Sequence, residues 1–232
     1  MAAPSHTMVN ILLILAAEKF KECRIIAWIM IRTISLLCLL IVIPLTAAWA
    51  AASVPVRVQV VDAKGVPVRD AVVEIDAAGS ESGRITFPWR MAMAQRNEQF
   101  VPGTLVVARG STVAFPNLDK VRHSVYSFSK PARFEIDLFG RDQTRTQNFP
   151  IAGAVALGCN IHDDMRGYIR VVDTPYAGKT DHNGMLSLDA VPSGSAVITV
   201  WHPRLRAPGN EMRRTVTISG GSNRHRLAVN LR

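Results

Sequence analysis

The chain has 232 residues, of which 48% are hydrophobic and 19% charged, so it can bury a core and is not a disordered tail. It carries 27 Lys+Arg against 18 Asp+Glu, a formal net charge of +9. A net positive charge of this size is typical of proteins that bind nucleic acid, an anionic membrane or an acidic partner. Three cysteines cannot form a disulfide framework, which excludes the small cystine-stapled secreted domains.

The N-terminus has the pattern of a secretory signal peptide. An uncharged apolar run at 33–50 (TISLLCLLIVIPLTAAWA) follows Arg32 and ends in the small-x-small sequence Ala48-Trp49-Ala50. We therefore predict that residues 1–50 are a leader and signal peptide, that translation starts at Met30, and that the mature protein is periplasmic. The alternative is a membrane anchor retained at residues 33–50, since this run has about the minimum length that spans a bilayer.

Removal of the leader changes the expected chemistry of the chain. It leaves Cys159 as the one cysteine, in an oxidising compartment where an exported thiol has to be buried or bound. Export also separates the protein from nucleic acid, so we predict no nucleic-acid partner. Seven arginines against Glu211 at 203–232 predict a basic face for an acidic partner or a membrane surface.

The chain after residue 50 is predicted to be all-β. Apolar residues recur with period two in short runs, and Gly-, Pro- and Asn-containing turn signals separate the runs. Many short strands at this spacing indicate β-sandwiches. The clearest runs lie at 56–60, 113–115, 134–138, 186–188, 198–200, 216–218 and 227–231.

Four side chains in the middle of the chain form a candidate metal site. Cys159, His162 and Met165 lie within seven residues, and His123 is the best-placed fourth ligand. Two His and one Cys in a plane, with a weak axial Met, are the ligand set of a blue-copper electron-transfer centre. Soft sulfur favours Cu(I) and imidazole suits both oxidation states, so one fixed site can pass an electron with little rearrangement.

Residues 86–173 resemble the cupredoxins, in particular plastocyanin, pseudoazurin and amicyanin. The resemblance is carried by the stretch from Phe100 to Asn117 (FVPGTLVVARGSTVAFPN), by the short Cys-x2-His-x2-Met loop, and by HSVYSF and GCNIHDDM, which are similar to methylamine-utilisation-type proteins. It implies an eight-stranded Greek-key sandwich with one type 1 copper, Cu(I) or Cu(II), at one end.

Two positions near the ligands depart from the family pattern. Ser124 stands after the first ligand His, where the family often has an Asn that ties the two ligand loops together. Asp163 and Asp164 place acid beside the second ligand His. With Ser124 the bond that ties the loops is expected to be weaker or different. The acidic pair leaves the exposure of the copper edge and its potential open.

The flanks resemble the two halves of a carboxypeptidase-regulatory, transthyretin-like β-sandwich. Nine motif positions carry this resemblance: Asp62, Gly65, Pro67, Ala71, Thr180, Asp181, Gly184, Pro192 and Gly194. We predict that residues 54–85 and 174–232 form one sandwich, because neither can bury its apolar face alone, and that the cupredoxin at 86–173 is inserted in it. The alternative is three sequential pieces, with 54–85 packed on the cupredoxin as extra strands. Pairing between 56–75 and 186–231 distinguishes the two.

Simpler interpretations of the candidate ligands stay open. Cys159 could be a buried structural thiol, His123 a core histidine and Met165 core filler. Zinc is disfavoured because Met is a poor zinc ligand. A Cys159–His162 nucleophile pair would lack an oxyanion loop and a third member.

The function predicted from these residues is that of a periplasmic one-electron carrier and not of an enzyme. The expected partner is a redox protein, such as a cytochrome c or a periplasmic dehydrogenase, with an acidic docking face. The alternatives are a periplasmic copper chaperone or storage protein, and an interaction module with a vestigial copper site.

Overall fold

The computed structural model describes residues 53–78 and 85–232. The predicted signal peptide, the start at Met30 and the alternative anchor at 33–50 lie outside these residues. Within the described ranges, no helix is long and apolar enough to cross a bilayer.

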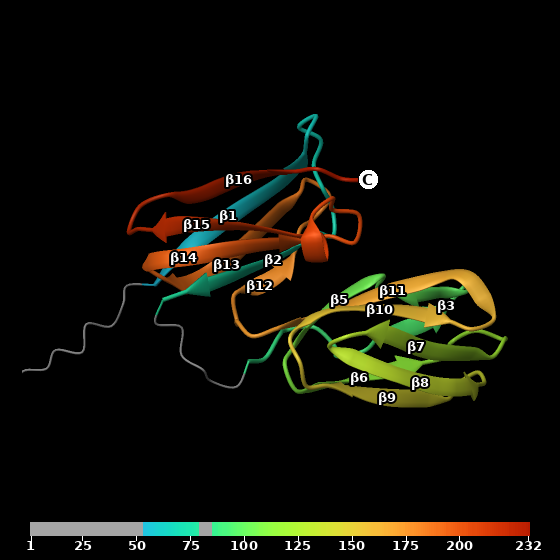
Figure 1. Ribbon diagram of the computed structural model, residues 1–232. Helices are drawn as coiled ribbons and strands as arrows, with labels where there is room; N and C mark the ends of the chain where they lie inside the picture. Colours follow the sequence, from blue (N-terminus) through green and yellow to red (C-terminus); the bar gives the residue numbers. More distant parts are fainter. Residues whose placement is uncertain (1–52, 79–84) are drawn as a thin grey trace, which may run out of the picture. The chain divides into compact units, whose positions relative to one another are not determined.

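The fold is all-β, as predicted. Its regular elements in the described residues are sixteen strands and one 3-10 turn at Pro208–Asn210 (Figure 1). The strands divide into two groups according to the sheets in which they pair. We call these groups the flanking sandwich and the central sandwich.

The flanking sandwich combines strands from both ends of the described chain. One of its sheets has the order β13-β1-β16 and the other has the order β12-β2-β14-β15. The strands are β1 (Ser53–Asp62), β2 (Val72–Ala77), β12 (Ala177–Lys179), β13 (Met185–Pro192), β14 (Gly194–Trp201), β15 (Glu211–Ile218) and β16 (Asn223–Val229).

Strands of the first flank pair with strands of the second flank in this sandwich, as expected from the sequence. Val58 pairs with Leu186 across β1 and β13, and Ile75 pairs with Ile198 across β2 and β14. The alternating residues of β1 point into a valine- and isoleucine-rich core shared with β2, β14 and β16. The two flanks therefore bury their apolar faces against each other, as expected for an inserted central part. The domain boundaries and the kinship of this sandwich with the regulatory-like family stay predictions.

The central sandwich holds the strands between the flanks. They are β3 (Ala94–Arg96), β4 (Gln99–Val101), β5 (Thr104–Ala108), β6 (Ser111–Pro116), β7 (His123–Ser129), β8 (Ala132–Phe139), β9 (Thr144–Phe149), β10 (Gly153–Cys159) and β11 (His162–Val172). Five strands form one sheet, β5-β11-β10-β7-β8. On the other side β6 pairs with β9. Single bridges join Ala114 of β6 to Ala92, and Gln95 of β3 to Asn117.

The central sandwich has nine strands where the resemblance implied eight. The short β3–β4 hairpin has a two-residue turn, Asn97-Glu98, in which both residues have positive φ. That conformation matches the twist of a tight hairpin, and Asn tolerates it well. The hairpin matters for function because its turn lies beside the candidate site.

A buried ion pair joins the two sandwiches. Arg170 on β11 donates to a Glu74 carboxylate oxygen on β2 and, at 2.7 Å, to Glu211 Oε1 on β15. Arg170 is 4% exposed and Glu74 is 8% exposed. A guanidinium in a dry environment needs such partners, because an unpaired buried charge is costly.

Replacement of Arg170 by Met is expected to lower the free energy of unfolding by about 3–5 kcal/mol, because it leaves the Glu74 carboxylate buried without its partner. Urea denaturation measures the effect. The control is Arg213→Met, since Arg213 pairs with Glu211 at the surface and its side chain is 69% exposed. Equal stability of the two variants would contradict the structural role of the buried pair.

Candidate metal centre

Three of the four predicted ligands come together at one end of the central sandwich. His123 begins β7, Cys159 ends β10 and His162 begins β11. Only Asn160 and Ile161 separate β10 from β11. Cys159 and His162 therefore lie at the two ends of one tight turn and pair with each other across the two strands. The sequence separation between His123 and this turn is closed by the pairing of β7 with β10.

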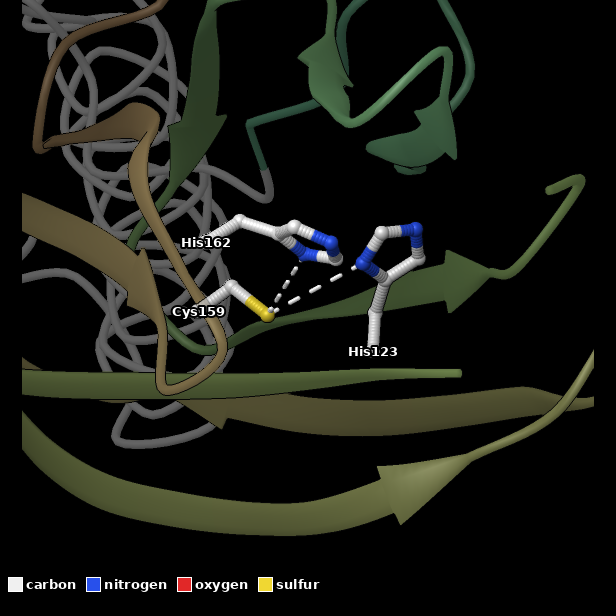
Figure 2. Close-up of side chains that lie close together, drawn as sticks. All are labelled: His123, Cys159 and His162. Atoms are coloured by element: carbon white, nitrogen blue, oxygen red, sulfur yellow. Dashed lines mark hydrogen bonds between the residues drawn. The ribbon is translucent and has the colours of Figure 1, made fainter. Parts of the chain in front are cut away.

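The donor atoms of these three residues converge. Cys159 Sγ lies 3.8 Å from His123 Nδ1 and 3.8 Å from His162 Nδ1 (Figure 2). All three donor atoms lie within 4.8 Å of one another. Ions bound by thiolate and imidazole sit about 2.0–2.3 Å from each donor, so one ion can bridge donors spaced in this way. The group is therefore able to hold a metal ion.

Burial differs among the three residues in a way that suits a metal centre with one outer edge. His123 is fully buried and Cys159 is 3% exposed. The side chain of His162 is 22% exposed. Ile161, beside it, is 51% exposed, and Asp163 and Asp164 also face solvent. The outer edge of the centre is thus a histidine between an apolar and an acidic neighbour.

Met165 lies in the same core as the thiol. It is 1% exposed and belongs to the hydrophobic cluster that contains Cys159. Both sulfur-bearing residues also line one surface groove with Tyr126 and Arg166. Burial among apolar neighbours suits a thioether, and its service as an axial ligand stays a prediction.

Ser124 joins the loop of His123 to the loop of Cys159. Its hydroxyl accepts a hydrogen bond from the Asn160 backbone N–H at 2.9 Å and lies 3.7 Å from Cys159 Sγ, to which it donates. The side chain is 1% exposed. A bond of a different kind therefore ties the loop of His123 to the loop of Cys159, through the hydroxyl of Ser124.

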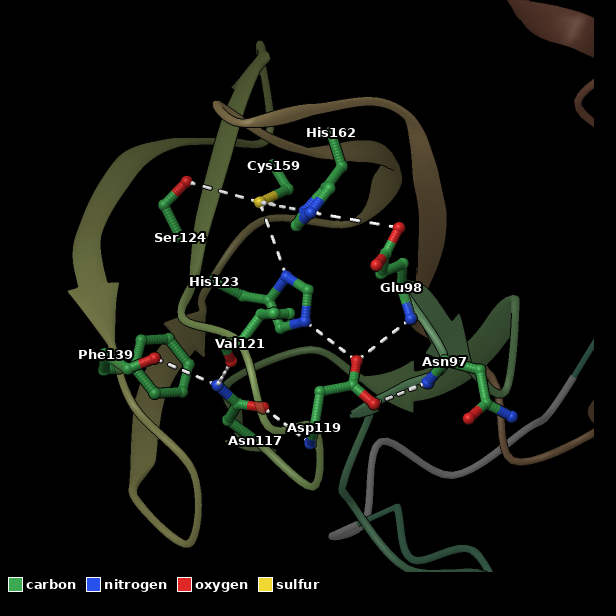
Figure 3. A network of polar contacts seen from close by, with 10 residues as sticks. All are labelled: Asn97, Glu98, Asn117, Asp119, Val121, His123, Ser124, Phe139, Cys159 and His162. Atoms are coloured by element: carbon green, nitrogen blue, oxygen red, sulfur yellow. Dashed lines mark hydrogen bonds and ion pairs between the residues drawn. The ribbon is translucent and has the colours of Figure 1, made fainter.

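A carboxylate that was not predicted from the sequence contacts the buried histidine. Asp119 Oδ2 lies 2.8 Å from His123 Nε2, and the carboxylate also accepts the backbone N–H groups of Asn97 and Glu98 (Figure 3). Burial disfavours its charge, but the hydrogen bonds from Glu98, His123 and Asn97 outweigh that cost and hold the pKa of Asp119 below its usual range. The one sequence signal was an acid four residues before the predicted ligand.

Glu98 was also missed. Its Oε2 lies 3.9 Å from His162 Nε2, and its side chain is 59% exposed. An ion pair this long and this exposed contributes little binding energy. The contact arises only because the β3–β4 turn folds next to the β10–β11 turn, so no local pattern could have indicated it.

Several solved structures of copper proteins are similar to part of this chain. The chain is similar to a copper-containing nitrite reductase (NirK) from Thermus scotoductus SA-01, with 24% identity over 43% of this chain and 25% of that one, and a TM-score of 0.34. It is similar to a reduced Cu(I) form of an amicyanin mutant, with 19% identity over 43% of this chain and 98% of that one, and a TM-score of 0.34. The chain is also similar to a purple cupredoxin from Nitrosopumilus maritimus, with 20% identity over 35% of this chain and 96% of that one, and a TM-score of 0.32.

The matched region spans only a quarter of the nitrite reductase chain, whereas it spans nearly all of amicyanin. No protein-family model matches the sequence. No curated protein sequence matches it either.

Replacement of Ser124 by Ala is expected to lower the free energy of unfolding of the metal-free protein by about 1–3 kcal/mol. The change removes a hydroxyl that is 1% exposed and that accepts the partly buried backbone N–H of Asn160. Urea denaturation again gives the value. Ser187→Ala is the control, because Ser187 is exposed on β13, and it should stay within about 0.5 kcal/mol of the unaltered protein. A Ser124 variant as stable as the control would show that the tie is dispensable.

Proposed function

We propose that this protein is an exported cupredoxin-type copper protein that carries one electron at a time. The observation that carries the proposal is the convergence of one thiol and two imidazole Nδ1 atoms within 4.8 Å. Soft sulfur with two imidazoles is a donor set suited to copper in both oxidation states, and less suited to a structural zinc site, which more often has several cysteines. We propose His123, Cys159, His162 and Met165 as the ligands of one copper per chain.

When bound, copper would supply the one-electron couple, Cu(II) to Cu(I), and the protein would supply a fixed and mostly dry environment. His123 and Cys159 are held below the surface by strands on both sides. Ser124 restrains the thiol, and Asp119 restrains the buried imidazole. Donors held in this way move little when the charge of the centre changes, which keeps electron transfer fast.

The electron is proposed to leave through His162, because this ligand reaches the surface. Its neighbours Ile161, Asp163 and Asp164 surround the edge that a partner would meet. The proposed role is that of a carrier and not of an enzyme.

The proposed location is the periplasm, on the strength of the signal-peptide pattern at 1–50. The proposed partner is a redox protein, such as a cytochrome c or a periplasmic dehydrogenase, with an acidic docking face. All seven arginines at 203–232 are exposed, which supports electrostatic steering toward an acidic surface. In addition, Arg57 and Arg224 are register partners on neighbouring strands, and both are exposed.

The test is a visible spectrum of residues 51–232 during titration with Cu(II). We expect an intense thiolate-to-copper band at one copper per chain, absent in Cys159→Ala and retained in His182→Ala, which removes an exposed histidine outside the group of ligands. Reversible bleaching and recovery with a one-electron reductant and oxidant would support the carrier role.

Other outcomes would overturn this proposal. A colourless protein that binds Cu(I) tightly would indicate copper delivery or storage. Failure to bind copper in either state would leave an interaction module. A band that survives Cys159→Ala would exclude the thiolate as a ligand.

A further inference from the structure

The buried histidine of the centre is held by a carboxylate that is itself fixed on several sides. Asp119 lies in the loop between β6 and β7. Its Oδ1 accepts the Asn97 N–H at 2.6 Å, and its Oδ2 accepts the Glu98 N–H at 2.9 Å and contacts His123 Nε2 at 2.8 Å. Its side chain is only 11% exposed. A carboxylate with these partners has one orientation available.

The side-chain amide of Asn117, which is fully buried, holds the loop that carries Asp119. Asn117 Nδ2 donates to the carbonyl oxygens of Val121 and Phe139, and Asn117 Oδ1 accepts the Asp119 N–H at 2.8 Å (Figure 3). This chain of hydrogen bonds runs from the core to the carboxylate and then to His123. The position of the carboxylate is therefore set before any metal is bound.

The contact decides which nitrogen of His123 faces the thiol. A carboxylate accepts and cannot donate, so His123 Nε2 carries the proton that Asp119 accepts. The other nitrogen, Nδ1, is then free of its proton in the neutral ring and faces Cys159 Sγ at 3.8 Å. A carboxylate on the far nitrogen of a ligand histidine also raises the basicity of the ligating nitrogen.

The two histidines of the centre differ in this respect. His123 has its carboxylate at 2.8 Å in a buried contact, whereas His162 has Glu98 at 3.9 Å with a mostly exposed side chain. Only the buried ligand is held by a short charged hydrogen bond. The Asp119 carboxylate also clamps the turn that carries Glu98, through the Asn97 and Glu98 N–H groups.

We propose that Asp119 is the positioning residue of this centre: it selects the Nε2–H form of His123, pre-orients Nδ1 toward the metal, and biases the bound copper toward Cu(II). The proposal rests on the proposed copper-binding function. A negative charge close to a ligand stabilises the more positive oxidation state, so Asp119 lowers the reduction potential.

The first measurement uses the metal-free protein and compares it with Asp119→Asn. The nitrogen-15 NMR spectrum of the His123 ring is expected to show protonation at Nε2 alone. In Asp119→Asn the single form should give way to a mixture. An unaltered protein with the proton on Nδ1 would overturn the proposal, whether or not the protein binds copper.

The second measurement compares Asp119→Asn with Asp181→Asn after copper loading. Asp181 is the matched control because its carboxylate also accepts two backbone N–H groups, from Asn183 and Met185, but lies in the flanking sandwich, away from any proposed ligand. Loss of an outer partner of a ligand typically weakens metal binding about 10- to 100-fold. We expect a loss of Cu(II) affinity in this range for Asp119→Asn.

We also expect a shift of at least about tenfold toward Cu(I), which corresponds to a potential higher by about 59 mV for a one-electron couple. Asp181→Asn should match the unaltered protein in both values. Equal potentials for the two variants would overturn the proposal. If the unaltered protein gives no thiolate-to-copper band, the proposed function fails, and the NMR result still decides the tautomer.

Discussion

The proposed function depends on the convergence of one thiol and two imidazoles that come from different parts of the chain. Cys159 and His162 share a tight turn, so their proximity is local. His123 lies 36 residues before Cys159 and reaches the thiol only through the pairing of β7 with β10. The remainder of the central sandwich holds these two strands in register. A slip of one residue would turn a donor to the opposite face of its strand.

Polar side chains stiffen this centre where strand pairing ends. Asn117, Asp119 and Ser124 are all well buried, and each makes hydrogen bonds to a ligand or to a loop that carries one. Such groups are costly to bury alone but add rigidity when every partner is present. The proposed ligands thus lie in a polar frame that connects the apolar core to the surface edge at His162.

The flanking sandwich buries apolar faces that come from both flanks of the chain. Its two halves lie on either side of the central sandwich in the sequence, and each would expose an apolar face without the other. Val58 and Ile75 enter one core with Leu186 and Ile198 as register partners. Arg170 then links β11, the strand that begins at His162, to the flanking strands through Glu74 and Glu211. The strand that leaves the metal centre is therefore tied to the second sandwich by a buried charge.

The sequence by itself determined the features that depend on local pattern. Period-two alternation predicted an all-β chain, and the Cys-x2-His-x2-Met spacing, with its resemblance to cupredoxins, indicated Cys159, His162 and His123 as neighbours. Paired motifs at 56–75 and 179–200 indicated that the flanks belong together. The tertiary structure alone decided the contacts of Asp119, Glu98 and Arg170. Asp119 and His123 are four residues apart, but the other contacts each depend on a turn or strand that folding brings in from 20 or more residues away, as when Asp119 accepts the N–H groups of Asn97 and Glu98. Side chains of this kind carry no periodic signal, because their role is fixed by what packs beside them and not by what precedes them in the chain.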